Sequence, residues 1–213
     1  MRWKGLLVFL AIVFLSACAR RVSSPVLKAP RTVAVLPFEA VCEPEGILFP
    51  CPVKEIAGGE IAPEAPEVLD NLLREMLSGR PGFRFVSREE YQALREEFLA
   101  QTERPTLVEW ARFLGKRLSV EALLYARVFR YQERWGRGYA VERPASVAFA
   151  LVLFEARSGR ILWKAWFDET QQPLSENLFK IRLYGGVRWL TARELAQRGL
   201  RQLLKDFPYP SGS

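Results

Sequence analysis

Residues 148–154 read Ala-Phe-Ala-Leu-Val-Leu-Phe, a run in which every side chain is apolar. A half-exposed strand alternates apolar and polar residues, so a continuous apolar run predicts a strand that is covered on both faces. It lies in the second of three long strand candidates, Val120–Glu133, Ala145–Ala156 and Arg160–Asp168, and Ser158-Gly159 predicts a tight turn before the third. The run therefore predicts the central strand of a sheet with helices packed on it.

Four amphipathic helices are predicted around these strands. Residues 64–78 carry apolar side chains at helical spacing, and Gly79 and Pro81 end the helix. Each of the other three begins with a capping box, in which a hydroxyl caps the helix and a Glu three residues later reaches back. The three pairs are Ser87/Glu90, Thr106/Glu109 and Thr191/Glu194.

Two short strands complete the pattern, Thr32–Glu39 and Phe83–Val86, and a long irregular segment, Ala40–Ala62, follows the first. The order β-α-β-α-α-β-β-β-α predicts an α+β fold (an α/β sandwich) with a mixed sheet, parallel early and antiparallel late, and helices packed on it. We expect one globular domain over residues 32–207 and a disordered tail over residues 208–213.

The beginning of the chain has the layout of an export signal. Two cations, Arg2 and Lys4, precede an apolar stretch over residues 5–15 and the tetrapeptide Leu15-Ser16-Ala17-Cys18. The apolar stretch is shorter than the roughly 20 residues of a membrane-spanning helix. Leu-Ser-Ala-Cys resembles a bacterial lipobox, which implies removal of residues 1–17, a diacylglyceryl thioether on Cys18 and an acyl chain on the new amino terminus.

Several lipid chains on Cys18 would hold the protein stably on a membrane surface without spanning it. In the lipoprotein families that this motif resembles, an aspartate after the cysteine retains the protein at the inner membrane. Ala19 stands there instead, which favours the periplasmic face of the outer membrane. We expect residues 18–31 to form a flexible tether, because they show no apolar periodicity and contain two prolines.

Cys42 and Cys51 are the two remaining cysteines. A disulfide between them is the default in an oxidising compartment, and the alternative is two unpaired thiols. The chain contains no histidine, which excludes Ser-His-Asp and Cys-His catalysis and most zinc chemistry. No cofactor is expected, and the adjacent carboxylate pairs do not resemble a general acid and base facing one cleft.

The net charge argues against nucleic acid as a partner. The full chain carries 31 Lys and Arg against 24 Asp and Glu, and the loss of Arg2 and Lys4 lowers the net charge from +7 to +5. This excess is modest and spread along the chain, and an exported protein does not meet nucleic acid. The simplest interpretation is that the arginines keep the surface soluble.

Two segments are candidates for binding a partner. The tip, residues 130–139, mixes arginines with aromatic residues, the types enriched in interface hot spots. The alternative is a hairpin whose aromatic side chains pack on its own stems. The second segment follows the third long strand, where polar side chains either contact a partner or tie down a turn. The candidates are Arg130, Tyr131, Arg134, Trp135, Arg137, Tyr139, Asp168, Gln171 and Gln172.

The strand Val33-Ala34-Val35-Leu36-Pro37-Phe38 follows the lipobox closely. This combination, with a loop and an amphipathic helix after it, resembles the envelope α/β domain of curli-secretion (CsgG-like) lipoproteins, the amino-terminal domain of TolB, PelC and the outer-membrane activators of penicillin-binding proteins. The resemblance implies a non-enzymatic envelope protein. Curli-secretion subunits carry long membrane-spanning segments, and the tip around Trp135 is too short for that role.

The leading hypothesis is an outer-membrane lipoprotein that binds envelope proteins in an assembly or export system. The second is a subunit of an oligomeric periplasmic ring that guides an exported polymer or protein, which requires a homo-oligomer. The third is a carboxylate enzyme that acts on cell-wall glycan through Asp168 or Glu169.

Overall fold

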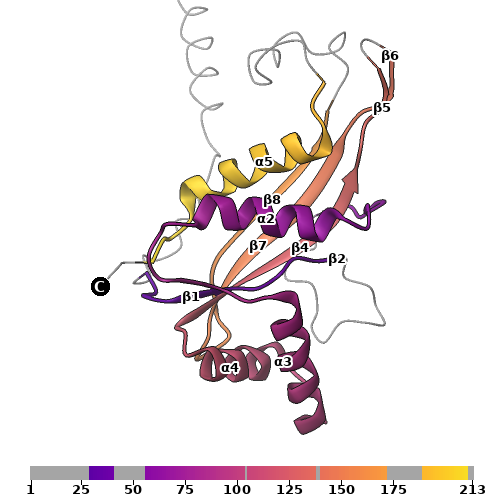
Figure 1. The fold of residues 1–213 in the computed structure, drawn as a ribbon. Helices are drawn as coiled ribbons and strands as arrows, with labels where there is room; N and C mark the ends of the chain where they lie inside the picture. The colour runs from indigo at the N-terminus through magenta and orange to yellow at the C-terminus, as the bar shows by residue number, and fades with distance from the viewer. Residues whose placement is uncertain (1–28, 41–55, 104, 138–139, 172–188, 211–213) are drawn as a thin grey trace, which may run out of the picture.

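The computed structural model describes residues 29–40, 56–103, 105–137, 140–171 and 189–210. Within these residues the fold is an open mixed sheet with helices on both faces, as predicted (Figure 1). The strands of the main sheet are β1 (Val33–Val35), β2 (Glu39–Ala40), β3 (Phe83–Phe85), β4 (Ala122–Gln132), β7 (Ser146–Glu155) and β8 (Ile161–Thr170). The helices are α2 (Ala65–Leu77), α3 (Arg88–Gln101), α4 (Leu107–Leu118) and α5 (Ala192–Leu203), and a 3-10 turn, η4 (Leu204–Asp206), follows α5.

The strand order is β3-β1-β4-β7-β8, and β2 follows β1 along the same edge of β4. β3, β1, β2 and β4 are parallel, whereas β4, β7 and β8 are antiparallel, so the predicted change of direction along the sheet is confirmed. β7 lies between β4 and β8, and the residues from Ser146 to Phe154 are all buried. The apolar run in β7 is therefore an interior strand covered on both faces, as predicted, but β4 and not β7 holds the middle of the strand order.

Each face of the sheet has its own hydrophobic core. α2 and α5 lie side by side on one face, where Val35, Leu124 and Phe149 meet Leu69 and Leu200 (Figure 1). α3 and α4 cover the other face. Among the described residues no helix is long and apolar enough to cross a membrane.

The first predicted strand is interrupted in the middle. β1 ends at Val35 and β2 begins at Glu39, because Pro37 has no N–H to give to a neighbouring strand. The N–H of Phe38 is turned away from the sheet and donates to a carboxylate oxygen of Asp70 on α2 at 2.6 Å. The interruption places the chain between β1 and β2 against α2.

Two of the three predicted capping boxes are complete, at Thr106/Glu109 and Thr191/Glu194. At the start of α3, Ser87 accepts from the N–H of Glu90, but the Glu90 carboxylate binds Arg84 at 2.6 Å instead of reaching back. Arg84 on β3 thus binds the Glu90 carboxylate in place of the backbone N–H of Ser87, and the Ser87/Glu90 spacing in the sequence does not show this.

Part of the segment predicted as irregular and part of the predicted disordered tail are held by specific contacts. Within the segment predicted as irregular, Gly59 and Ala62 donate to the carbonyls of Phe129 and Tyr131, so this stretch runs along the end of β4. Residues 208–210, predicted as tail, are packed: the Tyr209 hydroxyl donates to the Leu204 carbonyl at 3.0 Å, and Arg80 lies over its ring.

Candidate functional site

The tip forms a small sheet of its own. β5 (Trp135–Arg137) pairs with β6 (Ala140–Arg143), and the pair projects beyond the end of β4 (Figure 1). The sequence analysis did not predict these two strands as separate elements. The Trp135 side chain is 65% exposed, more than any other large apolar residue among those described. The structure therefore leaves this aromatic residue open to solvent.

The base of the tip is fixed to the amino end of α5. The Glu133 carboxylate accepts from the N–H of Ala192, the first residue of α5, at 3.2 Å. A negative charge is favoured there by the helix dipole. Arg134 donates to the carbonyl of Trp189 at 3.1 Å, which adds a second link to the segment before α5. Trp135 is thus presented from an anchored base.

Arg130 and Tyr131, at the end of β4, both make contacts within the protein. The Arg130 guanidinium forms an ion pair with Asp168 and donates to Ser146 Oγ at 2.6 Å and to the Ala57 carbonyl at 3.0 Å. Its aliphatic part leaves no space for a Cβ on Gly59, which would lie 2.8 Å from Arg130 Cδ. Tyr131 is 4% exposed, and its burial raises the pKa of its hydroxyl to about 12. Both residues support the tip from beneath.

Asp168 and Gln171 also make internal contacts. Asp168 on β8 pairs with Arg130 on β4 across the intervening strand β7, so the structure brings the two predicted segments together. Gln171 is 2% exposed, and its side-chain oxygen accepts from the N–H of Leu190 at 2.8 Å. This geometry agrees with the alternative in which these polar groups tie down the backbone.

The remaining predicted site residues cannot be placed in this arrangement. Arg137 belongs to β5, and its side chain is not described. The residues outside the described part of the chain are Cys18, Cys42, Cys51, Tyr139 and Gln172. Within the described part, no group of three or more His, Cys, Asp or Glu side chains is placed to hold a metal ion.

Comparisons with known proteins give a fold likeness only. No protein-family profile matches the chain, and no curated protein matches it. No family is therefore shown. Among solved structures, a PelC dodecamer from Paraburkholderia phytofirmans is 15% identical, with a TM-score of 0.48 over 85% of this chain and 90% of that one. Lipoprotein GNA1162 from Neisseria meningitidis is 15% identical (TM-score 0.38; 73% and 97% covered), and the LpoB C-terminal domain from Escherichia coli is 14% identical (TM-score 0.38; 80% and 100%).

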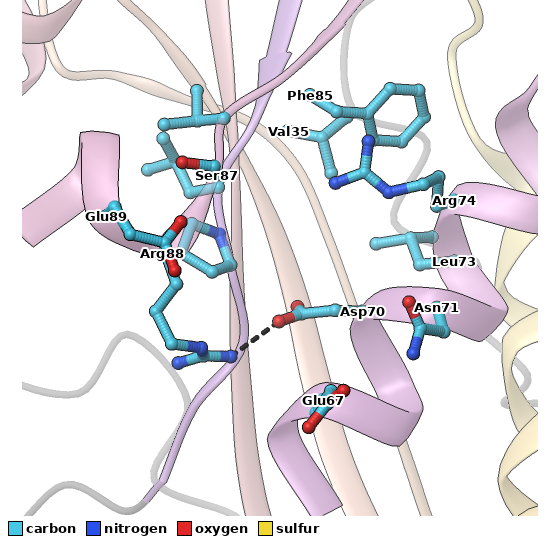
Figure 2. A pocket seen from close by; sticks show the side chains of 13 residues that line it. Val35, Glu67, Asp70, Asn71, Leu73, Arg74, Phe85, Ser87, Arg88 and Glu89 are labelled. Atoms are coloured by element: carbon cyan, nitrogen blue, oxygen red, sulfur yellow. Dashed lines mark hydrogen bonds and ion pairs between the residues drawn. The ribbon is translucent and has the colours of Figure 1, made fainter.

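A cavity of about 360 Å³, which the sequence analysis missed, lies at the carboxyl ends of β1 and β3 (Figure 2). The chain leaves β1 toward α2 on one face of the sheet and leaves β3 toward α3 on the other. Ligands of open α/β sheets bind at such a reversal, outside the carboxyl ends of parallel strands. The predicted order of elements contained this signal, but the pairing of β1 with β3 was needed to use it.

Asp70 lies at the centre of this cavity (Figure 2). Its carboxylate accepts from the Phe38 N–H and forms an ion pair with Arg88 at 2.5 Å. Burial raises the pKa of Asp70 above its usual range, and this effect outweighs the opposing hydrogen bonds. A desolvated carboxylate in a cleft is a recognised mark of a functional site.

Proposed function

We propose that the chain is a non-enzymatic lipoprotein, anchored through Cys18 at the periplasmic face of the outer membrane, that acts through contacts with envelope proteins. The anchor is supported by the sequence from Leu15 to Cys18 and by Ala19 after it. The protein–protein role is carried by one observation, the 65% exposure of Trp135 on a projecting hairpin.

Three physical arguments connect this observation with a partner. Tryptophan is among the residues most enriched in binding hot spots. A two-stranded hairpin is only marginally stable by itself in water, so a bound partner would stabilise it. Finally, Glu133 and Arg134 hold the base of the hairpin on the segment around the start of α5, which lowers the entropy lost on binding.

Replacing Trp135 with a photo-crosslinking amino acid in the full chain should give one predominant protein adduct in intact cells. Trp166 is the matched control, because it is also an exposed tryptophan (41%) but lies on β8. The adduct is identified by mass spectrometry, and Trp135→Ala should weaken binding to the purified partner by about 30-fold or more, the hot-spot range. Identical adducts from both positions, or none from position 135, would rule out the tip as the contact surface.

Replacing Cys18 with serine should remove the protein from the outer membrane, because serine cannot form the thioether. Fractionation of envelopes by density, followed by immunoblotting, checks this expectation. The unaltered chain should sediment with the outer membrane, and Cys18→Ser should either be soluble or retain an uncleaved signal. Sedimentation of both forms with the same membrane would contradict the lipid anchor.

The second candidate function is a subunit of an oligomeric ring, and the free edge of β8 favours it. β8 is the last strand in the order of the main sheet and pairs on one side only among the described strands. It also carries Ile161 and Trp166, each 41% exposed. Unpaired edges of this kind are templates for association. Light scattering of the full chain in detergent tests it: a discrete higher oligomer supports the ring, and a monomer eliminates it.

A further inference from the structure

The cavity beside Asp70 is separate from the tip and from the lipid anchor. It is lined on one side by α2 and on the other by the turn from β3 into α3, where Ser87, Arg88 and Glu89 lie (Figure 2). Its volume of about 360 Å³ is at the lower end of the range for ligand pockets, which run from about 300 to 1,000 Å³. It therefore suits a small molecule.

One stripe of α2 supplies most of the polar wall. Glu67, Asp70, Asn71 and Arg74 all line the cavity, and their spacing of three, four and seven residues places them on the same side of the helix. The buried stripe of α2, which includes Leu69 and Leu73, faces the sheet. The amphipathic helix thus has an apolar side for the core and an adjacent polar side for the cavity.

Two charged groups of the stripe, Glu67 and Arg74, form no ion pair with another described side chain, although the charge of Arg74 opposes the rise in the pKa of Asp70. Asp70 is paired with Arg88, and the Glu89 carboxylate accepts from its own N–H and from Ser87, which lowers its pKa. The Arg74 guanidinium lies 4.6 Å from the centre of the Phe85 ring, and no ion pair joins Arg74 or Glu67 to another described side chain. The cavity therefore offers one cation and one anion to a ligand.

The separation of these two charges sets the length of the ligand. Glu67 and Arg74 are seven residues apart, which is about 10 Å along a helix that rises 1.5 Å per residue. An extended chain covers at most about 3.3–3.6 Å per residue, so three residues cover the same length. Asn71 lies between the two charges and has both a donor and an acceptor, which matches the alternating N–H and C=O groups of a peptide.

We propose that this cavity binds a short peptide with free ends, with its terminal carboxylate on Arg74 and its terminal amino group on Glu67. The Phe85 ring holds the guanidinium of Arg74 from one face, so the N–H edge of the guanidinium stays available for a bidentate contact with the carboxylate. Asn71 binds the middle of the peptide.

Calorimetric titration of the full chain in detergent with trialanine tests the proposal. Trialanine should bind with one site per chain, and both trialanine amide and N-acetyl trialanine should bind about tenfold more weakly or worse, because each lacks one charge-assisted contact. Arg74→Gln should bind trialanine and its amide equally, and Glu67→Gln should bind trialanine and its acetylated form equally. These paired losses identify which end each residue holds.

Glu75→Gln on α2 and Arg201→Gln on α5 are the controls, since both residues are exposed and lie outside the cavity lining. Their affinity for trialanine should equal that of the unaltered chain, and all four variants should keep its melting temperature within a few degrees. No binding of trialanine at millimolar concentration would overturn the proposal. Equal affinity for the capped peptides, or inorganic phosphate binding as tightly as trialanine, would overturn it too.

Discussion

Replacing Arg127 with methionine is expected to lower the free energy of unfolding by about 3 kcal/mol, the cost of leaving a buried charge without its partner. The Arg127 side chain is 9% exposed and forms an ion pair with Glu39, whose side chain is 19% exposed. Tyr91 donates its hydroxyl to the same Glu39 carboxylate at 3.0 Å, and the guanidinium lies 4.3 Å from the centre of the Tyr125 ring. Without Arg127, the carboxylate loses this ion pair and retains the hydrogen bond from the Tyr91 hydroxyl.

The loss should be visible as a fall in melting temperature of about 6–12 °C for a chain of this size. Arg117→Met is the matched control, because Arg117 pairs with Glu97 at the surface, where the two side chains are 52% and 33% exposed. An exposed pair contributes about 0–1 kcal/mol. Equal losses for the two variants would contradict the buried character of the Arg127–Glu39 pair.

A double variant separates the ion pair from general packing. Arg127→Met with Glu39→Met removes both charges together and leaves none to be buried alone. We expect it to unfold at a higher temperature than Arg127→Met alone, because an apolar pair of similar volume replaces the salt bridge. Additive losses in this double-mutant cycle would show that the two charges do not interact.

Replacing Phe149 with alanine is expected to have the largest effect on stability, about 4 kcal/mol, which is the middle of the range for removing a buried aromatic ring. Phe149 is fully buried on β7, and its ring contacts Phe38 edge-on at 6.1 Å and Phe167 at 5.5 Å between ring centroids. α5 packs against the same ring at Gly199, where a Cβ would lie 2.9 Å from it. Three separate elements therefore lose contacts at once.

Chemical denaturation monitored by circular dichroism measures this effect. Ile161→Ala on β8 is the control, since Ile161 is 41% exposed and should lose less than about 1 kcal/mol. For both variants the free energy of unfolding should fall with denaturant concentration at the same slope, because the substitutions hardly change the surface exposed on unfolding. A loss below about 1.5 kcal/mol for Phe149→Ala would mean that the site collapses around the smaller residue.

The pattern of apolar residues predicted most of the fold. The helical spacing of apolar residues over residues 64–78 predicted a helix packed on the sheet. The unbroken apolar run over residues 148–154 predicted a strand buried on both faces. The capping residues predicted where helices begin, because a hydroxyl satisfies backbone N–H groups that are free in every helix of this kind. These signals are local, so the sequence contains them.

The residues predicted to bind a partner fall into exposed and internally bonded groups, and their positions in the sequence do not show which is which. Trp135 is exposed, whereas Arg130, which is five positions earlier, is paired with Asp168 beneath the tip. Trp135 lies on β5, in the small sheet outside the main one, whereas the partner of Arg130 is 38 residues away along the chain. Only the register between β4, β7 and β8 brings those two charges together.

By itself the sequence determined the alternation of helices and strands, the covered interior strand β7 and most helix starts, because each depends on residues close together in the chain. The export signal at residues 1–17 stays a prediction of the sequence. Tertiary structure alone decided the hydrogen bond from Phe38 to Asp70, the diversion of Glu90 to Arg84, the buried Arg127–Glu39 pair and the cavity beside Asp70. Each of these features is formed by residues from separate elements of the chain. Those residues come together only through the order and register of the strands, which no single segment of the sequence shows.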